Sequence, residues 1–185
     1  MPNWCFNNVS VVTCNDTALA KNQLNRFQEE CFIKDKKENL PENIDFDFNK
    51  IIPMPESLCI SSPAYNKKEK DIYTKNVHKY GHGDWYSWSI CNWGTKWNAC
   101  DTYINDIQDN YFDFSFNTAW APPIPLLYAL SEKYPLLRFD TEYEEEGVGF
   151  AGRLILCEEL NIKIDKDLPS RQFYNERKMI GKIIL

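Results

Sequence analysis

Apolar and polar residues alternate in several short stretches of the chain, and a period of two is typical of β-strands. Residues 4–13 carry three valines in such a pattern and predict a first strand. Residues 111–116 alternate strictly, so they should present phenylalanines on one face and polar side chains on the other. The strands expected along the chain are 4–13, 44–48, 95–104, 110–117, 137–143 and 150–157.

Helical periodicity separates these strands. An amphipathic helix is expected over residues 17–32, where apolar side chains recur every three to four positions. A second helix follows the proline-containing turn at 119–123 and stops at the Tyr-Pro pair of residues 134–135. A shorter helix near 68–79 lies within a polar segment, 56–83, that is interpreted as an insertion.

The order of these elements indicates the fold class. It runs strand, helix, strand, insertion, strand, strand, helix, strand, strand, which predicts an α+β, ferredoxin-like antiparallel sheet with two helices on one face. We expect this domain to span residues 1–157, with its insertion at about 56–83. Residues 158–185 contain Pro169 and a basic segment, and they are expected to form a C-terminal extension.

Composition narrows the classes of function. The 185 residues carry a net charge of −6, which disfavours a broad basic face for nucleic acid. No apolar run is long enough to cross a membrane, so no membrane partner is expected. The seven cysteines form no C-x-x-C pair, which argues against zinc and a disulfide framework and favours free thiols in a reducing cytoplasm. His78 and His82 are four apart, but Gly81 and Gly83 bracket the second, so neither a metal nor a cofactor is expected.

Aromatic residues make up 15% of the chain and include six tryptophans. They are densest between residues 84 and 98, where Trp85 and Trp88 would share a helix face and Gly94 would end that helix. Two interpretations stay open: the indoles pack in the core, or they form a pocket for a planar ligand or a partner's aromatic anchor. The residues of that candidate pocket are the walls Trp93, Trp97 and Trp120 and the polar side chains Lys96 and Asn98.

An acidic run over residues 140–146 ends one of the expected strands. Glu142 and Glu144 should face one way along this strand, and Tyr143 and Glu145 the other. Carboxylates at this spacing can bind a divalent cation or share a proton. An acidic strand end is more often a solvated edge that discourages aggregation between strands, and this interpretation is favoured over a cation site.

Short sequence blocks in a fixed order carry a resemblance to a known family. The blocks are MPNWCFN (1–7), FNKIIPMP (48–55), WGTKWNA (93–99), WAPP (120–123) and GFAG (149–152). Together they resemble the YubB-type ferredoxin-like family, small proteins encoded largely by phages, prophages and plasmids, over roughly residues 1–157. The resemblance implies the fold and an accessory role. It carries over no reaction and no catalytic residues.

Three functions remain as hypotheses. The first is a non-catalytic accessory binding protein of a phage or mobile element, a counter-defence factor that docks on a host protein. Its binding residues would be Trp93, Lys96, Trp97, Asn98, Trp120, Glu142, Tyr143, Glu144 and Glu145. The alternatives are a nucleic-acid- or nucleotide-binding protein, which the net charge disfavours, and a metal-dependent hydrolase that uses the acidic strand end. The partner expected for the first hypothesis is a host or phage protein in the cytoplasm.

Overall fold

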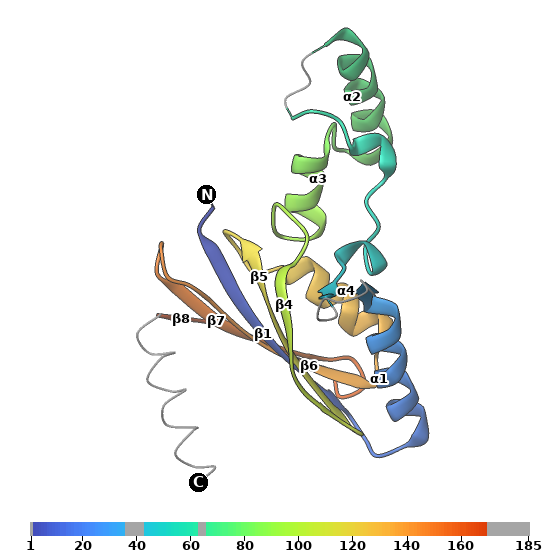
Figure 1. Ribbon diagram of the computed structural model, residues 1–185, viewed down its shortest axis with the longest axis vertical. Coiled ribbons are helices and arrows are strands. Elements are labelled where there is room, and N and C mark those ends of the chain that lie inside the picture. Colours follow the sequence, from blue (N-terminus) through green and yellow to red (C-terminus); the bar gives the residue numbers. More distant parts are fainter. Residues whose placement is uncertain (1, 36–42, 63–65, 170–185) are drawn as a thin grey trace.

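The computed structural model of the chain describes residues 2–35, 43–62 and 66–169 (Figure 1). Its elements are β1 (Trp4–Thr13), α1 (Ala18–Cys31), β2 (Phe32–Asp35), β3 (Asn43–Phe46), η1 (Phe48–Lys50), η2 (Glu56–Leu58), α2 (Lys67–Tyr80), α3 (Trp85–Asn92), β4 (Cys100–Gln108), β5 (Tyr111–Ala119), α4 (Ile124–Lys133), β6 (Leu137–Glu145), β7 (Phe150–Cys157) and β8 (Ile162–Pro169). No helix within the described ranges is both long and apolar enough to cross a membrane.

Six strands form one antiparallel sheet in the order β4–β5–β1–β6–β7–β8. Strands β1 and β4 are parallel to each other with β5 between them, and β5 and β6 are parallel with β1 between them. This is the split-βαβ arrangement, with α1 in the first connection and α4 in the second. The expected fold class, an α+β ferredoxin-like sheet with two helices on one face, is therefore confirmed.

The sheet face that α1 and α4 cover holds the hydrophobic core (Figure 1). Phe27 of α1 is fully buried at the centre of this layer. The rings around it, with centroids 5.4 to 6.0 Å away, are Phe32, Phe112, Phe114, Tyr134 and Phe139. Pairs of this kind stabilise a core by about 0.5–1.5 kcal/mol each beyond the burial of their area.

The strict alternation expected in β5 is confirmed. Phe112, Phe114 and Phe116 are at most 1% exposed and lie in the aromatic layer beneath the helices. The intervening Asp113 and Ser115 point to the opposite face of the sheet. Because the three rings are covered, they cannot stack on nucleic-acid bases, and the nucleic-acid hypothesis loses its main structural support.

Two expected strands differ from the sequence prediction, one in the sheet to which it belongs and the other in the residue at which it begins. The strand expected at 44–48 is β3, which pairs with β2 in a separate small sheet and ends at Phe46. The chain then turns because the Asp47 side chain accepts a hydrogen bond from the backbone N–H of Asn49 at 3.0 Å and so caps η1. The strand expected from residue 95 begins only at Cys100, after a turn that belongs to the candidate site.

The main sheet continues beyond residue 157, where the sequence pattern ended it. A turn closed by the hydrogen bond from Asn161 N–H to the carbonyl of Glu158, at 3.0 Å, leads into β8, which pairs with β7 along its length. The extension expected over residues 158–185 thus begins with a strand of the domain itself. Its basic residues beyond 169 lie outside the described part of the chain. Charged residues hide the period of two in β8, because a strand at the outer edge of the described sheet tolerates them on both faces.

The expected insertion at about 56–83 carries α2 and, together with α3, which follows it, forms an arm that rises from one end of the sheet (Figure 1). Its helix was expected near residues 68–79, and α2 matches that range. Asn76 of α2 is 3% exposed, and its amide donates to the carbonyls of Ser57 and Gly83 at 2.8 and 3.2 Å. The Ser57 hydroxyl donates in return to the Asn76 side-chain oxygen at 2.8 Å. These bonds hold α2 against η2 and against the start of α3.

The ion pairs of Glu30 at the end of α1 predict a pH dependence of folding. The Tyr134 hydroxyl donates to Glu30 at 2.8 Å, and Arg26 and Lys133 lie 3.0 and 3.2 Å from its oxygens. The hydrogen bond from Tyr134, together with the two cations, lowers the pKa of Glu30 from 4.5 to about 2. The stabilisation is therefore complete above the unfolded-state pKa and is lost as the pH falls toward 2.

We expect the Glu30→Gln variant to lose this contribution. In urea unfolding, the wild-type chain should be more stable than the variant at pH 6, and the difference should disappear near pH 2. Glu29→Gln, which changes an exposed carboxylate on the same helix, is the matched control. A wild-type advantage over Glu30→Gln that stays constant between pH 6 and pH 2 would contradict the assignment.

Candidate binding surface

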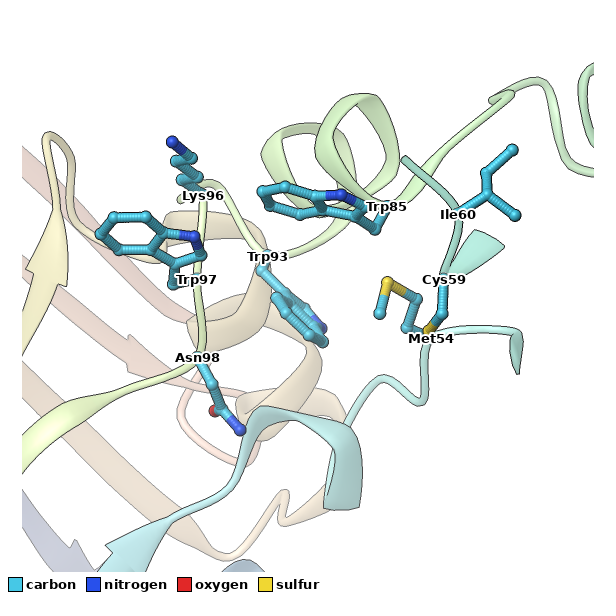
Figure 2. A pocket seen from close by; sticks show the side chains of 8 residues that line it. All are labelled: Met54, Cys59, Ile60, Trp85, Trp93, Lys96, Trp97 and Asn98. Atoms are coloured by element: carbon cyan, nitrogen blue, oxygen red, sulfur yellow. The ribbon is translucent and has the colours of Figure 1, made fainter. Parts of the chain in front are cut away.

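A pocket of about 360 Å³ lies where the arm meets the sheet (Figure 2). One wall comes from the segment between η1 and α2, and the other from α3 and the turn that follows it. The residues that line it are Met54, Cys59, Ile60, Trp85, Trp93, Lys96, Trp97 and Asn98. Four of the five residues expected between positions 93 and 120 therefore line one cavity, and the fifth, Trp120, lies beside it against Lys96.

The turn after α3 is built by local sequence signals. Asp84 caps the helix by accepting from the backbone N–H of Ser87 at 3.0 Å. Burial acts to raise the pKa of Asp84, but the hydrogen bonds from Ser87 leave that pKa below its usual value. Gly94 ends the helix, as expected, because its φ of +84° lies in the left-handed region that favours glycine. The buried Thr95 then donates to the carbonyl of Ala119 at 2.8 Å, which fixes the turn against the end of β5.

Trp93 belongs both to the core and to the pocket. Its side chain is 4% exposed, and its ring contacts Phe48 and Trp88 at centroid distances of 5.7 and 5.4 Å. The indole N–H donates to the carbonyl of Ile52 at 2.9 Å, so its polar atom is satisfied. Core packing and a role in the pocket are therefore compatible for Trp93, because this core residue also forms a wall of the cavity (Figure 2).

The ammonium group of Lys96 is surrounded by aromatic rings. Its distances to the ring centroids are 4.5 Å for Trp97, 5.0 Å for Trp120, 5.7 Å for Tyr86 and 6.0 Å for Trp85. All four lie within the range in which a ring face attracts a cation. None of the ion pairs between described residues involves Lys96. A positive charge that no carboxylate of the described residues pairs with is thus held beside an apolar cavity.

Trp120 is held in a strained backbone conformation at the surface. Its φ is +70°, in the left-handed region, and its side chain is 42% exposed. The backbone N–H donates to the carbonyl of Asn3 at 3.0 Å, which ties this residue to the start of the chain. A bulky residue in this region costs about 1–2 kcal/mol relative to the right-handed region. Strain of this kind concentrates at functional positions, where the surrounding structure enforces it.

Asn98 has a structural role that limits its use in binding. Its side-chain oxygen accepts from the backbone N–H groups of Phe48 and Ala99 at 2.8 and 3.0 Å. Its amide nitrogen donates to Asp47 at 2.7 Å. Asn98 therefore lines the pocket but directs its polar atoms into η1 and its own turn, in contrast to the polar recognition role expected for it.

The acidic strand end divides into two faces, as the alternation predicts. Glu145 is 1% exposed, and its carboxylate accepts from the backbone N–H groups of Gly147 and Val148 at 2.8 and 2.6 Å. Tyr143 is likewise buried, whereas Glu142 and Glu144 are half-buried on the opposite face. Glu145 thus stabilises the turn between β6 and β7 and points away from the other two carboxylates. No group of three metal-ligating side chains is present among the described residues.

The acidic strand end and the pocket lie at the same end of the sheet. Asn3 connects them, because its carbonyl accepts from Trp120 N–H and its side chain packs against Gly147 in the β6–β7 turn. The Trp4 ring lies 6.2 Å from that of Trp97. No pattern in the sequence indicates this proximity, since more than twenty residues of chain separate the two groups.

Sequence reasoning missed two aromatic residues of this region, Trp4 and Tyr86, which are 39% and 38% exposed. The signal that could have found Trp4 is its period-two spacing from Phe6, because both are exposed on one face of β1. We define the aromatic surface as Trp4, Tyr86, Trp97 and Trp120 around Lys96.

The hydrogen bonds of Asn98 predict a loss of stability on substitution. Asn98→Ala leaves Asp47 and the N–H of Phe48 without their partner, and we expect the free energy of unfolding to fall by about 2 kcal/mol. Asn117→Ala, which removes a single exposed hydrogen bond to Asp101, should change it by less than about 0.5 kcal/mol. Urea unfolding measures both. Equal, small effects of the two substitutions would contradict the structural role of Asn98.

The left-handed backbone of Trp120 predicts an unusual ranking of two variants. Trp120→Gly and Trp120→Ala both remove the ring, but only glycine adopts φ of +70° without a steric cost. We expect the glycine variant to be more stable by about 1 kcal/mol in urea unfolding. An alanine variant of equal or greater stability would show that the strain is absent.

Comparison with known proteins agrees with the fold. Residues 92–180 match a protein family described as the ferredoxin-like domain in Api92-like protein. This range contains Trp93, Lys96, Trp97, Asn98 and Trp120, whereas Trp4, Tyr86 and the other pocket wall lie before it. A crystal structure of protein api92 from Yersinia pseudotuberculosis aligns with 91% of this chain and 98% of that chain, with a TM-score of 0.48 and 8% sequence identity. No curated protein matches the chain. The matched family has a ferredoxin-like fold, as the resemblance to YubB-type proteins implied, but it is described as Api92-like. That description names neither a reaction nor a partner.

Proposed function

We propose that the protein is a non-catalytic binding protein that docks on a partner protein through the aromatic surface. The observation that carries this proposal is Trp120, an exposed tryptophan held in a left-handed backbone conformation against the ammonium group of Lys96. Core packing does not require this arrangement, because the ring remains 42% exposed. Tryptophan and tyrosine are the residues on which protein interfaces most often depend.

The pocket specifies the kind of group that the partner inserts. Its volume of about 360 Å³ is in the lower part of the range of ligand sites, and Met54, Ile60 and Trp85 give it an apolar lining. An apolar or aromatic side chain of the partner fits this lining better than a polar group does. Asn98 presents no unsatisfied polar atom to the cavity, since its side chain already bonds to Asp47 and Phe48.

The charge of Lys96 specifies what lies beside that anchor. Four aromatic rings lie within 6.0 Å of its ammonium group, which belongs to none of the ion pairs between described residues. A carboxylate on the partner would therefore gain a charge-assisted contact at the pocket mouth. The preferred partner segment has an apolar anchor with an aspartate or glutamate next to it.

The resemblance to YubB-type proteins supports a biological setting for this proposal. Proteins of that family are encoded largely by phages, prophages and plasmids, so the partner that we propose is a host protein in the cytoplasm. Docking would then serve counter-defence. The alternative functions have weaker support, because the β5 phenylalanines are buried and Glu145 is engaged by the β6–β7 turn.

Affinity capture from host-cell lysate, followed by binding measurements with the purified partner, tests this function. We expect Trp97→Ala and Trp120→Gly to weaken the interaction by roughly 30-fold or more, which is the size of an interface hot spot. Tyr103→Ala is the matched control, because Tyr103 is 64% exposed on β4 and lies outside the aromatic surface. It should bind like the wild-type chain.

Two outcomes of this experiment would contradict the proposal. Folded Trp97→Ala and Trp120→Gly variants that keep wild-type affinity would remove the aromatic surface from the interface. A folded wild-type chain that captures no protein, and whose unfolding midpoint rises instead with nucleotides, would show that the pocket binds a small ligand.

A further inference from the structure

Two cysteines that are distant in sequence meet in the folded chain. Cys14 follows the last residue of β1, and Cys157 is the last residue of β7. Their sulfur atoms lie 2.6 Å apart, although 143 positions separate them in the chain. No contact between described residues joins two of the other five cysteines.

The sheet positions this pair by hydrogen bonds on both sides of β6. Strand β6 lies between β1 and β7. Just before it begins, the carbonyl of Leu136 accepts from Cys14 N–H at 2.9 Å, and the carbonyl of Pro135 accepts from Glu159 N–H at 3.1 Å. Backbone bonds next to each cysteine therefore fix the two strand ends, and the approach of the sulfurs follows from the sheet itself.

The distance between the sulfurs is shorter than an ordinary contact. Non-bonded heavy atoms settle at about 3.5 Å or more, and a disulfide bond measures about 2.05 Å. We propose that Cys14 and Cys157 form a reversible intramolecular disulfide, which makes them a redox modification site of the protein. The two sulfurs need to move by only a fraction of an ångström to reach bonding distance.

Glutathione disulfide is the oxidant class that we assign to this step. The Cys14 thiolate attacks one sulfur of glutathione disulfide and releases one glutathione thiolate, which leaves a mixed disulfide on Cys14. The Cys157 thiolate then attacks the Cys14 sulfur and releases the second glutathione. The protein loses two protons and two electrons, and one glutathione disulfide becomes two glutathione molecules. Cys14 reacts first because it is half-exposed, whereas Cys157 is 1% exposed.

The surroundings of the pair make oxidation slow at neutral pH. Burial raises the pKa of Cys14 to about 12, and the neighbouring Cys157 and Glu159 add to the rise, while Arg138 opposes it. Few molecules carry the reactive thiolate at pH 7, so the rate of oxidation should increase as the pH rises.

The position of the pair separates this property from the proposed binding function. Cys14 lies beyond the end of β1 that is opposite Trp4, and ten strand residues span roughly 30 Å. A disulfide here would join β1 to β7 across β6 and stabilise the domain without contact with the aromatic surface. Failure of one proposal therefore leaves the other intact.

Alkylation under denaturing conditions, after incubation with glutathione disulfide, tests the inference. We expect mass spectrometry to find one pair of peptides joined by a disulfide between Cys14 and Cys157. The exposed Cys59 and Cys91 should instead be found in the alkylated form after mild reduction. The unfolding midpoint should rise by about 5–15 °C on oxidation and return with dithiothreitol. The rate of cross-linking should be higher at pH 9 than at pH 7.

Variants separate this pair from general thiol chemistry. Cys14→Ser and Cys157→Ser should abolish both the joined peptide and the rise in midpoint, and Cys91→Ser, which changes an exposed thiol, should keep both. The wild-type chain alone also decides the question. If Cys14 and Cys157 of folded, oxidised protein are both fully alkylated on denaturation, or if cross-links are spread over other cysteines, the proposal is wrong.

Discussion

The aromatic layer between the sheet and its helices is the interaction on which the rest of the structure depends. Phe27 contacts rings from both sides of this layer, among them Phe114. The ring of Phe114 in turn packs against that of Phe46 in the small second sheet, with the centroids 5.0 Å apart. The chain of rings continues from Phe46 to Phe48 at 5.4 Å and from Phe48 to Trp93 at 5.7 Å. Trp93, which forms a wall of the candidate pocket, is therefore the outer end of the hydrophobic core. The same ring contacts anchor the arm to the sheet.

Much of the fold could be predicted because apolar and polar side chains alternate along its strands. This alternation repeats every two residues, so β1 and β5 could be recognised in the sequence, and an apolar face of leucines indicated α4. Strand β8 could not be recognised in the sequence because half of its eight residues are charged, a composition that its outermost place in the described sheet permits. The break between β3 and η1 depends on the side chain of Asp47, a local hydrogen bond that a periodic pattern does not register.

The candidate site was predictable in composition but not in arrangement. The density of tryptophans indicated where to look, and Trp93 and Lys96 do line one cavity. The sequence could not show that Asn98 and Glu145 use their polar atoms to hold η1 and the β6–β7 turn. Apart from the Asp47 carboxylate, those partners are backbone N–H groups, which are the same for every residue type and leave no trace in the amino-acid pattern. The approach of Cys14 to Cys157 was hidden for a related reason, since it depends on strand order.

The two outer strands of the described sheet differ from the strands between them in a way that bears on self-association. Strand β4 has two register shifts against β5, so its outer edge is irregular, and β3 lies beside part of it, where Phe46 N–H donates to the Thr102 hydroxyl at 3.3 Å. Strand β8 alternates charge at Lys163, Asp165 and Lys166 along its exposed positions. A regular, uncharged edge would offer its unpaired backbone groups as a template for another copy of the chain. With an irregular edge on one side and a charged edge on the other, the sheet is protected against growing into a fibre, even where the protein accumulates.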